Sequence, residues 1–250
     1  MALAAALPAH GASVIETRTA FSNVQLSVRD LAPDDGIAAN YAIVPTSYTA
    51  LSSFAALGPN DLELTRYEDE AFADLGQAGS ASISAGQATT WVRTDGSLGS
   101  LETFASFPGP SPAGHLYSSG IQYFRVDLAA HSELWLSGDY AMSISRQGDD
   151  LGTQSANVSM LAQLSDQGRT VQEDLDLWAR QDEPGGQRSG HFNLGFANDS
   201  DVSTRIYLYM TSGSSTYGNE PLAAIPEPQT YAMFGAGLLL LAARRKFARK

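Results

Sequence analysis

Hydrophobic and polar residues alternate with a period of two along much of the chain. An early example is the run Val24, Leu26 and Val28, whose intervening residues are polar. With this period, apolar side chains share one face of a β-strand and polar side chains share the other. The longest run spans Leu134 to Ile144, and Gly138 within it predicts a bend or bulge. Further runs follow the same rule over residues 124–128, 158–164, 171–177, 192–196 and 206–210.

Turn-forming residues separate these runs. Gly, Pro, Asp, Asn and Ser supply turn geometry at residues 31–37, 148–150, 165–168, 184–186 and 198–201. Several strands with one apolar face, joined by regular turns and without an amphipathic helix, are typical of two packed antiparallel sheets. We therefore predict an all-β fold, a jelly-roll-like antiparallel two-sheet sandwich.

Residues 38–118 follow the pattern less clearly. Short apolar pieces alternate there with Gly, Ser and Ala stretches, which predicts short strands and long loops. The stretch from Phe107 to Pro112 is dense in proline and is excluded from a central strand. A long surface loop within one sandwich is favoured over a boundary between two subdomains.

The pattern changes completely at the C-terminal end. Residues 229–243 form a mostly apolar helix of roughly 22 Å, which falls short of the ~30 Å hydrocarbon core of a bilayer. Pro226, Glu227 and Pro228 precede this run, and the prolines hold the glutamate in an extended, accessible conformation. A basic cluster follows the run, and it predicts a short transmembrane helix with a cytoplasmic tail. This cluster consists of Arg244, Arg245, Lys246, Arg249 and Lys250. The alternative is a short, buried core helix with a basic cap.

The order Pro226-Glu227-Pro228, apolar helix and basic cluster resembles the PEP-CTERM sorting signal of Gram-negative bacteria. The resemblance implies an exported protein that its tail holds in the inner membrane. An exosortase, a membrane-embedded enzyme similar to cysteine transpeptidases, would then process it near Glu227 and release it to the cell surface or extracellular matrix. The segment from Leu31 to Ile37 after an extended strand is similar to the opening of uncharacterised β-rich PEP-CTERM cargo.

These features divide the chain into four parts. Residues 1–12 are similar to the later part of a secretory signal peptide, with a disordered Ala-rich terminus as the alternative. Residues 13–211 form the β-sandwich body. Residues 212–224, which begin SGSSTYGN, are expected to be a flexible linker. Residues 225–250 carry the sorting signal.

Charge and cysteine content exclude several classes of partner. Before the basic cluster, ten arginines stand against all 27 acidic residues of the chain, which leaves a formal charge of −17. Such a field repels nucleic acid and anionic membrane surfaces, so neither is expected as a partner of the body. The chain has no cysteine, so disulfides and thiolate chemistry are excluded.

Catalytic and metal motifs are weak. His10, His115, His131 and His191 do not form a His-Glu-x-x-His motif, and no Gly-x-Ser-x-Gly elbow occurs. Acidic residues at 173, 174 and 176 could form a glycosidase pair, but a solvated acidic strand edge explains them better. Paired acids at 34–35, 149–150 and 199–201 could bind calcium, although turn chemistry accounts for them without metal. We expect no cofactor, no metal and no enzymatic activity, and a hydrolase ranks third among the functions considered.

Aromatic residues on polar strand faces give the binding hypothesis. Trp135 lies opposite the Leu134 face, and Tyr207 and Tyr209 lie opposite Ile206 and Leu208. Such rings could stack on sugar rings, unless both faces of these strands are buried. The preferred function is a non-enzymatic surface or matrix protein associated with exopolysaccharide or biofilm. The alternative is a carbohydrate-binding module that uses Trp135, Tyr207 and Tyr209.

Overall fold

The computed structural model of the 250-residue chain describes residues 14–57, 64–72, 76–108, 114–147, 154–180 and 183–218. Its contacts divide the chain into two compact units, Met1–Asn219 and Glu220–Lys250, and the second unit lies outside the described residues. The described part contains strands and no helix. The strands are β1 (Val14–Asp30), β2 (Tyr41–Leu57), β3 (Leu64–Phe72), β4 (Gly79–Ala85), β5 (Ala88–Thr94), β6 (Glu102–Pro108), β7 (Gly114–Leu128), β8 (Ser132–Gln147), β9 (Gln154–Ser165), β10 (Thr170–Ala179), β11 (Gly186–Asn198) and β12 (Thr204–Gly218).

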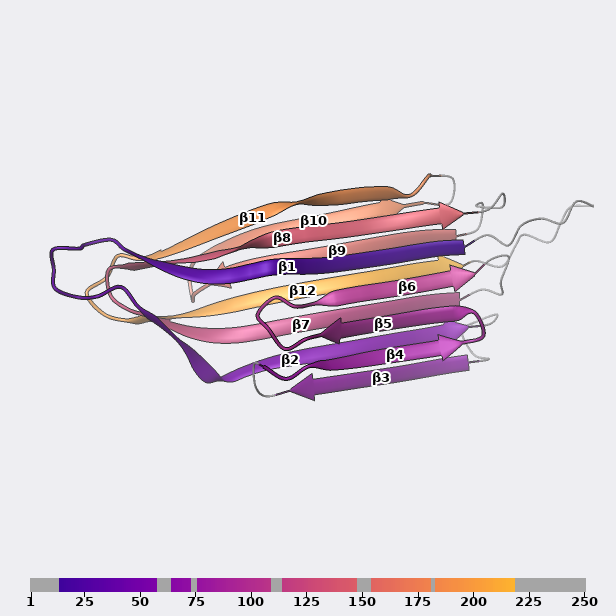
Figure 1. Cartoon of the computed structure of the whole chain (residues 1–250), viewed down its shortest axis with the longest axis horizontal. Helices are drawn as coiled ribbons and strands as arrows, with labels where there is room; N and C mark the ends of the chain where they lie inside the picture. Colours follow the sequence, from indigo (N-terminus) through magenta and orange to yellow (C-terminus); the bar gives the residue numbers. More distant parts are fainter. Residues whose placement is uncertain are drawn as a thin grey trace, which may run out of the picture. The chain divides into compact units, whose positions relative to one another are not determined.

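The strands form two antiparallel sheets of six strands each. The first, sheet A, has the order β11-β8-β1-β6-β5-β4, and the second, sheet B, has the order β10-β9-β12-β7-β2-β3. In Figure 1 the strands of both sheets lie along nearly the same axis, with arrows that point in opposite directions, and each sheet order can be followed from top to bottom. The predicted all-β sandwich of two antiparallel sheets is confirmed.

The core lies between the two sheets and is formed by the predicted apolar faces. In β8, Leu134, Leu136, Met142 and Ile144 are at most 2% exposed. Phe124 of β7 and the inward residues of β9, β11 and β12 meet them in one continuous cluster. Each large apolar side chain that is fully buried contributes about 1.5–3 kcal/mol relative to exposure, so this cluster supplies the main stabilisation.

Gly138 lies opposite a bulge in the neighbouring strand. The pairing of β1 with β8 shifts between Ser22 and Gln25, so two residues of β1 face Gly138. One of them, Asn23, has a φ of 54°, the left-handed conformation that such bulges use. A Cβ at Gly138 would lie 2.9 Å from the Phe192 ring and 2.9 Å from Val24. The predicted irregularity therefore belongs to β1, and Gly138 leaves the space that it requires.

The prediction of short strands over residues 38–118 holds for β4, β5 and β6, which have 7 residues each, but the prediction of long loops was wrong over β2. Instead, β2 has 17 residues, and β4, β5 and β6 follow one another in sheet A. Their inward faces carry small or hydroxylated residues, including Thr49, Ser53 and Thr90, which are at most 4% exposed. Two of these hydroxyls donate to backbone carbonyls, Ser53 to Ala81 at 2.8 Å and Thr90 to Phe104 at 3.2 Å. Burial without large apolar side chains is the reason that the pattern was hard to detect.

The predicted flexible linker is also wrong over its first seven residues. Residues 212–218 continue β12, which pairs with β7 on one side and β9 on the other through Gly218. Ser212, Ser214 and Thr216 point inward and are at most 1% exposed. Ser212 is hydrogen-bonded to Thr19 of β1, and Ser214 to Thr103 of β6. The body therefore extends to Gly218, and residues 219–224 lie outside the described part.

Side chains block the open edges of sheet A. Glu70 and Glu68 of β3 accept hydrogen bonds from the amides of Ser80 and Ser82 on edge strand β4, at 2.8 and 2.9 Å. Arg66 donates to the Ser84 carbonyl of the same strand at 3.1 Å. At the opposite edge, an Arg169 guanidinium donates to a β11 carbonyl. Unpaired edge groups invite pairing with another chain, and these bonds occupy them.

Sheet B ends in an acidic edge strand. β10 is the first strand of this sheet, and its Gln172, Asp174 and Asp176 are exposed, as predicted. Glu173 points to the opposite face because successive strand residues alternate. The Glu173 and Asp174 carboxylates therefore face apart and do not flank a common bond.

Candidate functional site

Four tyrosines line a groove on the outer face of sheet B, which we call the tyrosine groove. It has a volume of about 430 Å³. Its lining residues are Tyr48, Tyr123, Tyr207 and Tyr209, together with Arg125, Gln163 and Ser165. It is a shallow, open surface that combines aromatic rings with polar groups.

Strand register brings these residues together from four strands. Tyr48 of β2 pairs with Tyr123 of β7, and Tyr123 pairs with Tyr209 of β12. Tyr209 in turn pairs with Gln163 of β9. Residues directly opposite on neighbouring strands lie about 4.5–5.5 Å apart, so their side chains meet. The inward neighbours, Phe124 and Leu208, are buried, which fixes the tyrosines on the outer face.

The rings form a connected aromatic surface. The centroids of Tyr48 and Tyr123 are 5.3 Å apart, and those of Tyr123 and Tyr207 are 5.9 Å apart with an interplanar angle of 22°. The guanidinium of Arg125 lies 6.0 Å from the Tyr123 ring centroid. Aromatic pairs of this kind contribute about 0.5–1.5 kcal/mol beyond their buried area, so they hold the groove in shape.

The polar groups of the groove keep their hydrogen-bonding capacity at neutral pH. Burial, followed by the nearby Tyr48 and Tyr117, raises the pKa of Tyr209 above its ordinary value. Its phenol therefore stays protonated and can donate a hydrogen bond. The Gln163 amide and the Ser165 hydroxyl each both donate and accept. This arrangement suits a ligand with hydroxyl groups next to apolar C–H surface.

A second hollow adjoins the groove at Tyr207. It has a volume of about 630 Å³ and lies at the turn between β9 and β10. Arg205 in this hollow makes two bonds to Asp127, at 2.8 and 3.1 Å, so its charge is already paired. The Arg169 guanidinium lies 4.0 Å from the Phe196 ring centroid. The concave surface thus continues from the tyrosines toward the loops.

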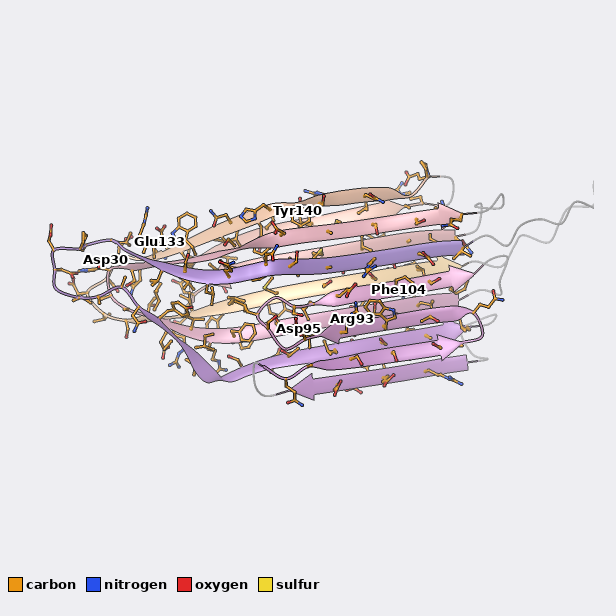
Figure 2. The ribbon with its side chains drawn as sticks, viewed as in Figure 1. Asp30, Arg93, Asp95, Phe104, Glu133 and Tyr140 are labelled. Carbon is orange, nitrogen blue, oxygen red and sulfur yellow. The ribbon has the colours of Figure 1, made fainter. Side chains whose placement is uncertain are left out.

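Trp135 does not belong to this site. It lies on the outer face of sheet A, whereas Tyr207 and Tyr209 lie on the outer face of sheet B. A Cβ at Gly195 of β11 would be 3.1 Å from the Trp135 ring, so the ring covers this glycine. Its Nε1 donates to Glu133 at 3.0 Å, and Glu133 also pairs with Arg29. Glu133 is labelled on this part of β8 in Figure 2. The structure thus separates the three aromatics that the sequence grouped together.

Another aromatic cluster lies on the outer face of sheet A. Trp91 and Phe104 stack with centroids 5.4 Å apart, and Arg93 lies 4.8 Å above the Trp91 ring. Arg93 and Phe104 are neighbours in Figure 2. The Glu102 carboxylate pairs with both Arg93 and Arg18. The charges of this cluster are satisfied within it, which makes it a useful control surface.

His131 joins two of the acidic loops at one end of the sandwich. Its Nδ1 contacts the Asp35 carboxylate, and its Nε2 lies 2.9 Å from Asp201. Hydrogen bonds to Asp35 and then Asp201 raise the pKa of His131. A bond from the Ile37 amide, followed by His131, lowers the pKa of Asp35. We call this group the His131 clamp. Across the described ranges, no cluster of three or more His, Asp or Glu could hold a metal.

The comparison with known protein families concerns the other end of the chain. Residues 224–246 match the family model described as the PEP-CTERM protein-sorting motif. The chain carries a PEP-CTERM sorting signal. This confirms the resemblance and indicates an exported protein that an exosortase processes. Neither the curated proteins nor the solved structures gave a match to the chain.

The PEP-CTERM residues themselves lie outside the described part of the structure. These are Pro226, Glu227 and Pro228 and the basic cluster of Arg244, Arg245, Lys246, Arg249 and Lys250. The predicted helix over residues 229–243 lies there too. Within the described ranges, no helix has the length and apolarity to cross a membrane.

Sequence reasoning found half of the tyrosines in the groove. It identified Tyr207 and Tyr209 but missed Tyr48 and Tyr123. A signal for Tyr123 was present, because it precedes the inward-facing Phe124 and therefore falls among the strand residues that point away from the core. Tyr48 gave no comparable signal, since the β2 pairing is irregular between Val44 and Tyr48.

Proposed function

We propose that this exported protein is a non-enzymatic component of the bacterial surface or extracellular matrix and binds polysaccharide through the tyrosine groove. The groove is the observation that carries the proposal. Its four rings, phenol groups and Gln163 amide match the alternating apolar and hydroxylated surfaces of a sugar. Tyrosine also supplies rigid, amphipathic contact area at a low entropic cost.

The sorting signal supports this location for the protein. After export, the tail would hold the chain in the inner membrane of a Gram-negative cell until an exosortase removes it. The released body would then meet the exopolysaccharide of the surrounding matrix. The paired charges of Arg205 and Asp127 and the outward-facing tyrosines favour binding over catalysis, because no activated nucleophile or acid pair lies in the groove.

A glycan-binding screen that includes the producing cell's exopolysaccharide tests the proposal. The double variant Tyr207→Ala/Tyr209→Ala should lose binding, since it removes two of the four rings. The control Trp91→Ala removes a larger ring from the outer face of sheet A and should bind like the wild type. Equal binding by the wild type and the groove variant would contradict the proposal.

A further inference from the structure

A second aromatic group lies on the same outer face of sheet B, and we call it the distal row. Its members are Tyr67 of β3, Phe54 of β2, Tyr117 of β7 and Trp178 of β10. Phe54 pairs with both Tyr67 and Tyr117, and the row continues through Ser215 and Asn157 to Trp178. The exposed fractions of Tyr67 and Trp178 are 64% and 63%. These are large aromatic surfaces that the groove does not use.

The distal row and the tyrosine groove are separated along the strands by a fixed distance. Tyr117 and Tyr123 both belong to β7 and share its outer face, six residues apart. At a rise of about 3.3–3.4 Å per residue, their Cα atoms are roughly 20 Å apart along the strand. Because both lie on one regular strand, this spacing is set by the sheet rather than by a loop.

Two cross-strand rows form the floor between the two aromatic groups. The row next to the tyrosine groove consists of Ala50, Ile121, Thr211 and Leu161, and the row next to the distal row consists of Ser52, Ser119, Gly213 and Ser159. A Cβ at Gly213 would have the Ser159 hydroxyl at 3.2 Å as its nearest neighbour, so no large side chain covers this position. A ligand that contacts both aromatic groups can therefore pass between them along the strands.

We propose that the outer face of sheet B binds one extended, uncharged polysaccharide chain that contacts the tyrosine groove and the distal row together. This inference rests on the proposed function and adds the length and charge of the ligand. A linear polymer repeats the same sugar surface at intervals, which matches two aromatic anchors that are separated along the strands by a floor of apolar and hydroxylated residues.

The acidic residues that flank the floor disfavour an anionic chain. Asp174 and Asp176 are exposed on β10 beside the floor, and Asp69 is exposed on β3 on the other side. Asp69 pairs with Ser52, and Asp176 with Ser159, so both acids flank the serine row directly. The nearby Asp174 and the burial of Asp176 raise the pKa of Asp176, with burial the larger cause. An anionic polymer would be repelled by these acids and by the charge of −17 before the basic cluster.

Two anchors on one chain give a testable dependence on length. Once a chain reaches both anchors, the second contact is intramolecular and raises the affinity by a factor on the order of 10² or more. Fragments too short to span roughly 20 Å engage one anchor only. Affinity should therefore rise steeply at one fragment length rather than gradually.

The experiment uses the full chain in mild detergent and isothermal titration calorimetry. The probe is the neutral fraction of the producing cell's exopolysaccharide, treated with protease and hydrolysed to a ladder of fragment sizes. The wild type should bind long fragments more tightly than short ones by a factor of about 10² or more. Tyr117→Ala/Trp178→Ala should abolish this gain and leave short-fragment affinity unchanged. Trp91→Ala is the matched control and should retain the gain.

The possible outcomes separate the two proposals. Short-fragment binding that depends on Tyr207 and Tyr209 but does not increase with length would overturn the inference and leave the proposed function intact. Absence of binding at every length would overturn the proposed function. Tighter binding of the acidic fraction would overturn the assignment of an uncharged chain. Loss of binding after protease treatment would identify a protein partner and overturn both.

Discussion

Replacing Thr103 with Val tests the buried hydroxyl cluster that joins the two sheets. The Thr103 hydroxyl is hydrogen-bonded to Thr19 and lies 2.7 Å from the Ser214 hydroxyl. All three residues are at most 1% exposed. Valine has the shape of threonine without the hydroxyl, so Thr103→Val removes these two bonds and leaves little empty space. Thr19 retains its bond to Ser212.

The expected loss in the free energy of unfolding comes from the Ser214 hydroxyl, which loses its hydrogen-bond partner. In the described part of the chain, Thr103 is the only residue that bonds to the Ser214 hydroxyl. An orphaned buried polar group costs about 1–3 kcal/mol, and this group dominates the change. For a domain of this size, 1 kcal/mol lowers the melting temperature by about 2–4 °C. Thr103→Val should therefore lower it by roughly 2–12 °C, with a matching loss in the urea midpoint.

A double variant separates this effect from general disturbance. Thr103→Val/Ser214→Ala also removes the orphaned hydroxyl, so the free energy of unfolding should exceed that of the single variant Thr103→Val. Urea denaturation of the wild type, both single variants and the double variant completes the cycle. A Thr103→Val protein as stable as the wild type, or purely additive losses, would refute the buried network. Such a result would also reopen the assignment of Ser214 to β12.

Three further outcomes are expected. Gly138→Val should lower the free energy of unfolding by about 1–3 kcal/mol in urea denaturation, because its side chain would overlap Phe192; a neutral result would contradict the close packing. The His131 clamp should stabilise the protein most at mildly acidic pH. The raised pKa of His131 gives stability that is complete below about pH 6.5 and lost as pH rises through the folded-state pKa. The lowered pKa of its aspartate partner gives stability that is lost as pH falls below about 4. Melting curves of the wild type and His131→Gln should therefore converge at alkaline pH, and a constant gap would exclude the clamp. Glu227→Ala should leave membrane insertion intact but block processing, so that full-length protein accumulates in the membrane fraction; release at the wild-type rate, judged by intact mass, would contradict this.

The strands were predictable where large apolar residues alternate with polar ones. Leu134, Leu136 and Met142 identify β8 by side-chain size alone. β2 and the end of β12 bury Ser, Thr and Ala instead. The composition of these segments resembles that of a loop or linker, so they were not predicted as strands. The decisive information is non-local, since Ser212 and Ser214 are buried only because β1 and β6 place Thr19 and Thr103 against them.

The candidate site was predictable only within one strand. Tyr207 and Tyr209 alternate with buried neighbours on β12, so the sequence predicts that both tyrosines point to the outer face of this strand. Which strands lie beside β12 depends on sheet order, and periodicity does not encode it. For the same reason, Trp135 looked equivalent to these tyrosines, although its strand belongs to the opposite sheet.

The side chains that cap β4 affect how the exported protein can associate with its own copies. Exported proteins accumulate at high local concentration, where an unoccupied strand edge can seed fibril growth. Glu68, Glu70 and Arg66 engage the backbone groups that a growing fibril would use. Replacement of Glu68 or Glu70 should therefore change the tendency of the protein to self-associate far more than its free energy of unfolding. Edge-to-edge growth through β4 is therefore disfavoured, so contacts of this molecule with its surroundings would use its sheet faces rather than this edge.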